Sequence, residues 1–150
     1  MNDDFLDLLR ALIAERARYM VVGAHALAVH GVPRATGDLD VWIDTSGDNP
    51  ARVLAAVKRF GAPVGELGLS VDEFTQADRV VQIGLPPRRI DVLTGLSGLE
   101  FAAAWTGRLV QRVGALEVAF LGRSDLIRNK RATGRVRDLA DLEALGERPL

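Results

Sequence analysis

Residues 38–44 constrain the fold more than any other part of the chain. In this segment, aliphatic side chains (Leu39, Val41 and Ile43) alternate with acidic or aromatic ones. Alternation with a period of two residues predicts a β-strand that buries its aliphatic face in a core. The carboxylates of Asp38 and Asp40 then lie together on the opposite face of the sheet.

Extended and helical segments interleave along the rest of the chain, which favours an α/β or α+β fold. The first helix is expected to begin at an N-cap residue, Asp3 or Asp4. Helices are expected at 3–16, 24–30, 51–60 and 98–107 and from 125 and 136 onward, with a weaker one at 71–76. Strands are expected at 19–22, 38–44, 80–84 and 89–93, and as a hairpin at 110–112 and 117–121.

Length and composition predict a single domain over residues 1–150. With 48% hydrophobic and 26% charged residues, the chain does not have the composition of a disordered protein. The absence of cysteine excludes a disulfide scaffold, a thiolate metal site and a cysteine nucleophile. No apolar run approaches the ~18 residues of a membrane span, and the first residues are acidic. We therefore expect a cytoplasmic protein without a membrane partner.

The net charge of −1 conceals a basic half. Between Arg88 and Arg137 there are ten basic and four acidic residues. Such a bias is typical of a surface that faces phosphate. A well-solvated face in an arginine-rich protein has the same composition, so charge alone leaves both interpretations open.

Three carboxylates are candidates for one site. Asp38 and Asp40 share a face of their strand, and Asp91 lies inside the strand at 89–93, among residues that favour burial. Carboxylates held close together repel each other unless a cation or a proton shares the site, and hard divalent ions such as Mg²⁺ prefer oxygen ligands. The alternatives are a solvent-facing strand for the Asp-x-Asp pair and a strand end for Asp91.

A glycine follows the strand at 19–22 and precedes a helix. Backbone N–H groups at Gly23 and Ala24 can approach a phosphate in such a turn, although strand–glycine–helix turns are common. The sequence contains neither a Walker-type loop nor a dinucleotide-binding glycine motif.

Two segments together resemble a known superfamily. The stretch 21–41 reads VVGAHALAVHGVPRATGDLDV, and the tail at 129–142 reads NKRATGRVRDLADL. The first resembles the head of the DNA polymerase beta-type nucleotidyltransferases. It is closest to small bacterial nucleotidyltransferase-like proteins, several of them linked to toxin–antitoxin and abortive-infection systems. The tail resembles a Lys…Arg…Lys/Arg-Asp-x-x-Asp-Leu pattern of the same group.

This resemblance implies a polymerase-beta-like fold, a small mixed β-sheet flanked by helices, and roles for the matching positions. Asp38, Asp40 and Asp91 would be the catalytic carboxylates and would ligate Mg²⁺ or Mn²⁺. Gly23 would bring the backbone near the phosphates. Many members carry serine at the next position, whereas this chain has Ala24 without a hydroxyl. Triphosphate binding then falls to backbone amides and to the remaining candidate nucleotide-binding residues, which are Arg34, Thr36 and Lys130.

Two functions from different classes follow. The first is a metal-dependent nucleotidyltransferase that moves NMP from an NTP to a hydroxyl of a protein, an RNA end or a small molecule and releases pyrophosphate. The second is a catalytically weak nucleotide-binding or protein-binding module, such as one partner of a toxin–antitoxin pair. Metal-dependent NTP binding followed by pyrophosphate release distinguishes the first from the second.

Four further residues have a structural and a functional interpretation each. Trp42, on the carboxylate face, can stack a base or pack in the core. His30, before Gly31, fits a helix C-terminus better than a metal site, and a metal role for His25 has equally little support. Asp138 fits a capping or ion-pairing role in the last helix better than a catalytic one.

Overall fold

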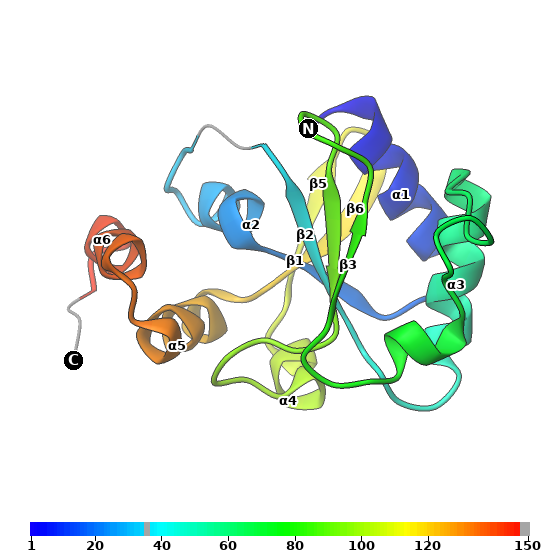
Figure 1. The fold of residues 1–150 in the computed structure, drawn as a ribbon. Coiled ribbons are helices and arrows are strands. Elements are labelled where there is room, and N and C mark those ends of the chain that lie inside the picture. The colour runs from blue at the N-terminus through cyan, green and yellow to red at the C-terminus, as the bar shows by residue number, and fades with distance from the viewer. Residues whose placement is uncertain (35–36, 148–150) are drawn as a thin grey trace.

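The chain folds into a six-stranded mixed β-sheet with helices on both faces (Figure 1). The structure is a computed structural model and describes residues 1–34 and 37–147. Strand order across the sheet is β3-β4-β2-β1-β6-β5. The strands are β1 (Tyr19–Val22), β2 (Leu39–Ile43), β3 (Val80–Ile83), β4 (Ile90–Leu93), β5 (Leu109–Val113) and β6 (Leu116–Phe120).

The centre of the sheet combines parallel and antiparallel neighbours. Strand β2 is parallel to β4 and antiparallel to β1, and β1 is parallel to β6. The edge strands β3 and β5 each pair antiparallel with the strand beside them. These pairings place the end of β1 beside the start of β2, because Val22 faces Asp40 across the ladder. The expected α/β class and the mixed sheet are confirmed.

Helices cover the two faces of the sheet unequally. In Figure 1, α1 and α3 lie on one side, and α2, α5 and α6 lie on the other. The α-helices of the described residues are α1 (Asp3–Ala14), α2 (Gly23–Val29), α3 (Asn49–Phe60), α4 (Phe101–Thr106), α5 (Arg123–Thr133) and α6 (Val136–Ala144). None of the helices within residues 1–34 and 37–147 has the length and apolar character needed to cross a membrane.

The alternation in β2 has the expected consequence. Leu39, Val41 and Ile43 are almost completely buried in the main hydrophobic cluster. Because Asp40 faces α2 and α5, these three side chains point to the face covered by α1 and α3. Trp42 shares the face of Asp40 but is 2% exposed and packs edge-on against Phe101 of α4. It is therefore a core residue, and its indole is not available to stack on a base.

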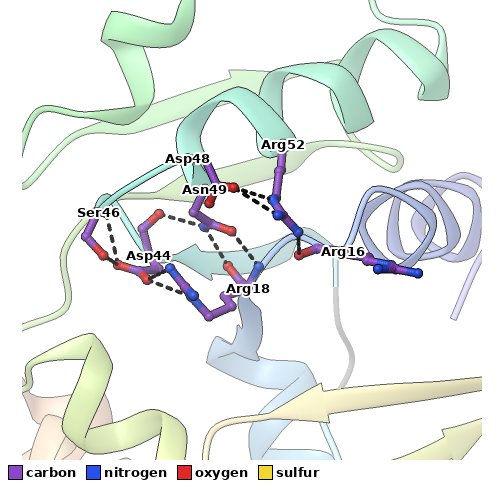
Figure 2. A network of polar contacts seen from close by, with 7 residues as sticks. All are labelled: Arg16, Arg18, Asp44, Ser46, Asp48, Asn49 and Arg52. Atoms are coloured by element: carbon purple, nitrogen blue, oxygen red, sulfur yellow. Dashed lines mark hydrogen bonds and ion pairs between the residues drawn. The ribbon is translucent and has the colours of Figure 1, made fainter.

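Figure 2 shows how α3 is attached to the end of the sheet where β1 begins and β2 ends. The Asn49 side chain accepts a hydrogen bond from the Arg18 N–H at 2.7 Å and donates to the carbonyl oxygens of Arg18 and Asp44. Arg18 and Asp44 form an ion pair at 2.6 Å. These hydrogen bonds of the Asn49 side chain thus go to backbone groups of Arg18, just before β1, and of Asp44, just after β2. This explains why α3 begins at Asn49, two residues before the expected start.

Other boundaries also differ from the sequence predictions. The N-cap of α1 is Asn2, whose side chain accepts from the Phe5 N–H at 3.0 Å, so the expectation of Asp3 or Asp4 is wrong. The weak helix at 71–76 is a single 3₁₀ turn, η1 (Val71–Phe74). Helix α4 begins at Phe101 because Gly98 has a φ of +78°, which is outside the α-helical region.

Candidate functional site

A cleft of about 310 Å³ opens between the sheet, α2 and the α5–α6 pair. Its floor includes Asp40 and Leu93, and Asn129 holds one rim by donating to the Ser97 carbonyl oxygen at 3.0 Å. Four of the predicted nucleotide-binding residues line it: Gly23, Ala24, Arg34 and Lys130. The fifth, Thr36, lies outside the described residues.

Gly23 makes the turn from β1 into α2 and lies directly against Asp40. Its φ is +68°, a conformation that favours glycine. A Cβ atom at this position would be 2.3 Å from a carboxylate oxygen of Asp40. The glycine is therefore needed twice, once for the backbone turn and once for the space that the Asp40 side chain occupies.

Gly23→Ala is accordingly expected to lower the free energy of unfolding by about 2 kcal/mol, from backbone strain and the contact with Asp40. The matched control is Gly31→Ala, since Gly31 also has a positive φ (+95°) but nothing within 4 Å of the added Cβ. Denaturant unfolding of both variants measures the difference. Equal losses would show that Asp40 moves aside without cost.

Strand register brings two of the three predicted carboxylates together. Asp40 of β2 and Asp91 of β4 are direct partners across parallel strands, so their side chains share one face of the sheet. Asp38 precedes Asp40 by two residues on the same face. The side chain of Asp91 is 12% exposed, whereas that of Asp38 is 35% exposed.

The environment of Asp40 disfavours its charged form. Burial, and then the negative charges of Asp91 and Asp38, raise the pKa of the Asp40 carboxyl from 3.8 to about 6. The positive charges of Arg89 and Arg137 act in the opposite direction but are outweighed. A cation near Asp40 would therefore favour its charged form.

Arg89 supplies positive charge at the other end of this group. Its Nε lies 3.0 Å from Oδ1 of Asp91, and its Nη2 donates to Oδ2 of Asp91 at 3.1 Å. The same Nε is 3.6 Å from Oδ2 of Asp38. Among the described side chains, no three acidic or histidine groups are arranged as ligands of one metal ion. The guanidinium holds two of the carboxylates in this arrangement instead.

A buried ion network forms the opposite wall of the cleft. Lys130 of α5 lies 3.3 Å from Oδ1 of Asp138 and 3.0 Å from Oδ2 of Asp141, both on α6. Asp141 also pairs with Arg34, and Asp138 accepts from the side chain and backbone of Arg135. Asp138 and Asp141 are almost fully buried, at 0% and 1% exposure. The predicted capping and ion-pairing role of Asp138 is confirmed.

Ionisation within this wall follows from those contacts. Burial alone raises the pKa of Asp138, but hydrogen bonds from Arg135, Thr133 and Lys130 outweigh it and hold the pKa well below its usual range. Burial lowers the pKa of Lys130, although its contact with Asp138 opposes that shift. The contact between Lys130 and Asp138 therefore stabilises the charged form of both side chains.

Arg137 is a residue of this wall to which the sequence analysis gave no role of its own. It lines the cleft, is exposed, and acts on Asp40 through its charge. Unlike Arg34 and Lys130, it has no carboxylate within ion-pair distance among the described residues. The signal that could have identified it is the Arg-x-Arg-Asp spacing, which places Arg137 directly before the buried Asp138.

The two histidines lie apart from the carboxylates. His30 is the C-cap residue of α2, as the capping interpretation predicts, and its Nε2 lies 2.8 Å from the carbonyl oxygen of Leu121, which follows β6. His25 is buried edge-on against Phe5, and burial lowers the pKa of its imidazole. Neither histidine is arranged with described acidic residues as a metal site.

The comparisons with known proteins do not identify a family for this chain. No protein-family model matches the chain, and no curated protein matches it at a significant level.

Proposed function

We propose that this chain is a metal-dependent nucleotidyltransferase with a polymerase-beta-like fold. It would transfer NMP from an NTP to a hydroxyl of a protein, an RNA end or a small molecule, with release of pyrophosphate. The observation that carries the proposal is Asp40, which is paired in register with Asp91 and lies on the floor of a cleft whose lining also includes the cation Arg137. A triphosphate with divalent ions needs carboxylates for the ions and cations for the phosphate oxygens.

The chemistry of the three donors, rather than their present arrangement among the described residues, suits Mg²⁺ or Mn²⁺. All three side chains are carboxylates, the oxygen ligands that hard divalent ions prefer. Burial, and then the negative charges of Asp91 and Asp38, raise the pKa of Asp40, and a bound cation would favour its charged form. Asp38, Asp40 and Asp91 would hold the metal. When bound, it would neutralise charge on the transferred phosphoryl group and lower the pKa of the acceptor hydroxyl.

Other residues that line the cleft would bind the phosphates of the nucleotide. Gly23 lets the backbone approach Asp40 closely, so a phosphate held near this turn would lie beside the carboxylates. Arg137 would bind the phosphate oxygens directly because its charge is not already committed to a carboxylate. Lys130 and Arg34 would contribute less than their charge suggests, since both contact Asp141.

Arg137→Ala is expected to weaken NTP binding about 10- to 100-fold, the loss of one charge-assisted contact of about 1.5–3 kcal/mol. The control is Arg112→Ala, because Arg112 is an exposed arginine on the edge strand β5, away from the cleft. Calorimetric titration with NTP in the presence of Mg²⁺ measures both. Equal losses would mean that the phosphates bind elsewhere.

The proposed reaction is tested by incubating the full chain with each of the four NTPs and Mg²⁺ or Mn²⁺ and measuring pyrophosphate release and labelled NMP transfer. Chelation of the metal should abolish both signals. A hydroxyl-rich RNA, a protein lysate and small alcohols serve as separate acceptor pools. Release that persists in chelator would contradict the proposal.

A second candidate is a catalytically weak nucleotide-binding or protein-binding module, such as one partner of a toxin–antitoxin pair. Two observations favour it: Ala24 has no hydroxyl for a phosphate, and Asp141 already holds Arg34 and Lys130. Tight NTP binding without pyrophosphate release for any acceptor pool would support this module and contradict the enzyme.

A further inference from the structure

The guanidinium of Arg89 lies against two of the three carboxylates of the site. Arg89 contacts Asp91 through two parallel N–H···O bonds of 3.0 and 3.1 Å, and it lies 3.6 Å from Asp38. Bidentate pairing of this kind is the strongest contact that arginine makes with a carboxylate. The guanidinium thus occupies oxygen atoms that a divalent ion would need.

The position of Arg89 in the sequence explains its reach. It precedes β4 and lies two residues before Asp91, so both side chains project from the same face of the sheet. Its neighbour Arg88 projects the other way and pairs instead with Asp4 of α1, at 3.2 Å. The two adjacent arginines therefore lie on different faces of the sheet, and of the two only Arg89 contacts Asp91.

We propose that Arg89 is an internal counter-ion that competes with the divalent cation for Asp91 and Asp38. This inference rests on the proposed function, because it concerns regulation of the same site. In the metal-free protein the guanidinium neutralises the carboxylates and keeps them together. Metal binding must break the Arg89–Asp91 pair, so Arg89 sets the cation concentration at which the site fills.

The effect is electrostatic and has a definite sign. Removing a positive charge a few ångströms from the metal position strengthens the attraction between carboxylates and cation. Arg89→Gln is therefore expected to bind Mn²⁺ at least about fivefold more tightly than the wild type, even though it loses contacts. A residue that merely supported the ligands would have the opposite effect, because its loss would disorder them and weaken binding.

The experiment is calorimetric titration of the full chain with Mn²⁺ alone, without nucleotide. Wild type is compared with Arg89→Gln, and the control Arg88→Gln removes the same unit of charge from the opposite face. Tighter binding by Arg89→Gln, with Arg88→Gln within about twofold of wild type, supports the inference. Unchanged or weaker binding by Arg89→Gln overturns it and leaves the proposed enzyme intact.

Two further measurements distinguish a failure of this inference from a failure of the proposed function. Arg89→Lys keeps the charge but loses the bidentate contact, so its Mn²⁺ affinity should fall between those of the other two proteins; it also answers the question if Arg89→Gln does not fold. If wild type, Arg89→Gln and Arg89→Lys all fail to bind Mn²⁺, both the inference and the metal-dependent function are overturned. Thermal unfolding with and without Mn²⁺ reports the same order independently.

Discussion

Lys130→Met is expected to lower the free energy of unfolding by about 3 kcal/mol. Removing one partner of a buried ion pair leaves the other charge without compensation, which typically costs about 3–5 kcal/mol. Here Asp138 and Asp141 are at most 1% exposed, and both contact Lys130. We expect the lower end of the range because Arg135 and Arg34 remain as partners.

The chain provides a matched control for this variant. Lys58, the only other lysine, is exposed on the last turn of α3. Lys58→Met removes the same charge and should change stability by less than about 0.5 kcal/mol. Urea unfolding of both variants measures the comparison. Similar losses would show that the network contributes little to holding α6 on α5.

Asp40→Asn is expected to abolish the proposed reaction while making the metal-free protein more stable above pH 6. Loss of a metal ligand removes several kcal/mol of transition-state stabilisation, so pyrophosphate release should fall on the order of 10³-fold. Stability changes in the opposite direction because the asparagine side chain carries no charge to bury beside Asp91 and Asp38. Asp72→Asn, at an exposed position, is the control for both measurements.

The pH dependence fixes the sign of this second effect. The pKa of Asp40 is raised from 3.8 in the unfolded chain to about 6 in the folded one. The wild type is therefore stabilised by the neutral carboxyl below pH 3.8 and loses that stability as the pH rises through 6. At pH 8 the variant should be more stable by about 2 kcal/mol, after allowance for partial solvent screening. Thermal unfolding in chelator from pH 4 to 8 tests this.

Much of this architecture could be predicted from periodicity. The strand at 38–44 was predictable because its apolar and acidic residues differ strongly, and each of the other strands also has a local signature. Their order across the sheet was not predictable, because it depends on which strands pair over long sequence separations. The register that places Asp40 beside Asp91 is such a pairing, so the convergence of these two carboxylates was a hypothesis until the sheet was seen.

The partners of the charged residues were the hardest to predict. Arg34 and Lys130 have the chemistry of phosphate ligands, but the fold places a buried carboxylate, Asp141, between them. Strand alternation places Arg89, and not Arg88, on the face of Asp91, but the sequence does not show that its guanidinium pairs with that carboxylate. Thr36, which we also expected to bind the nucleotide, lies outside the described residues.

The acidic and basic residues around the cleft are encoded far apart in the chain. Asp40 on the cleft floor and its neighbours Asp38 and Asp91 precede α5, whereas the cleft-lining Lys130 and Arg137 belong to α5 and α6. During translation the carboxylates therefore emerge from the ribosome well before Lys130 and Arg137. A growing chain can complete its central strands with Arg89 beside the acids, but it has no closed cleft. The proposed nucleotide binding would then require the last helices, so a prematurely released chain would have the carboxylates but no closed cleft.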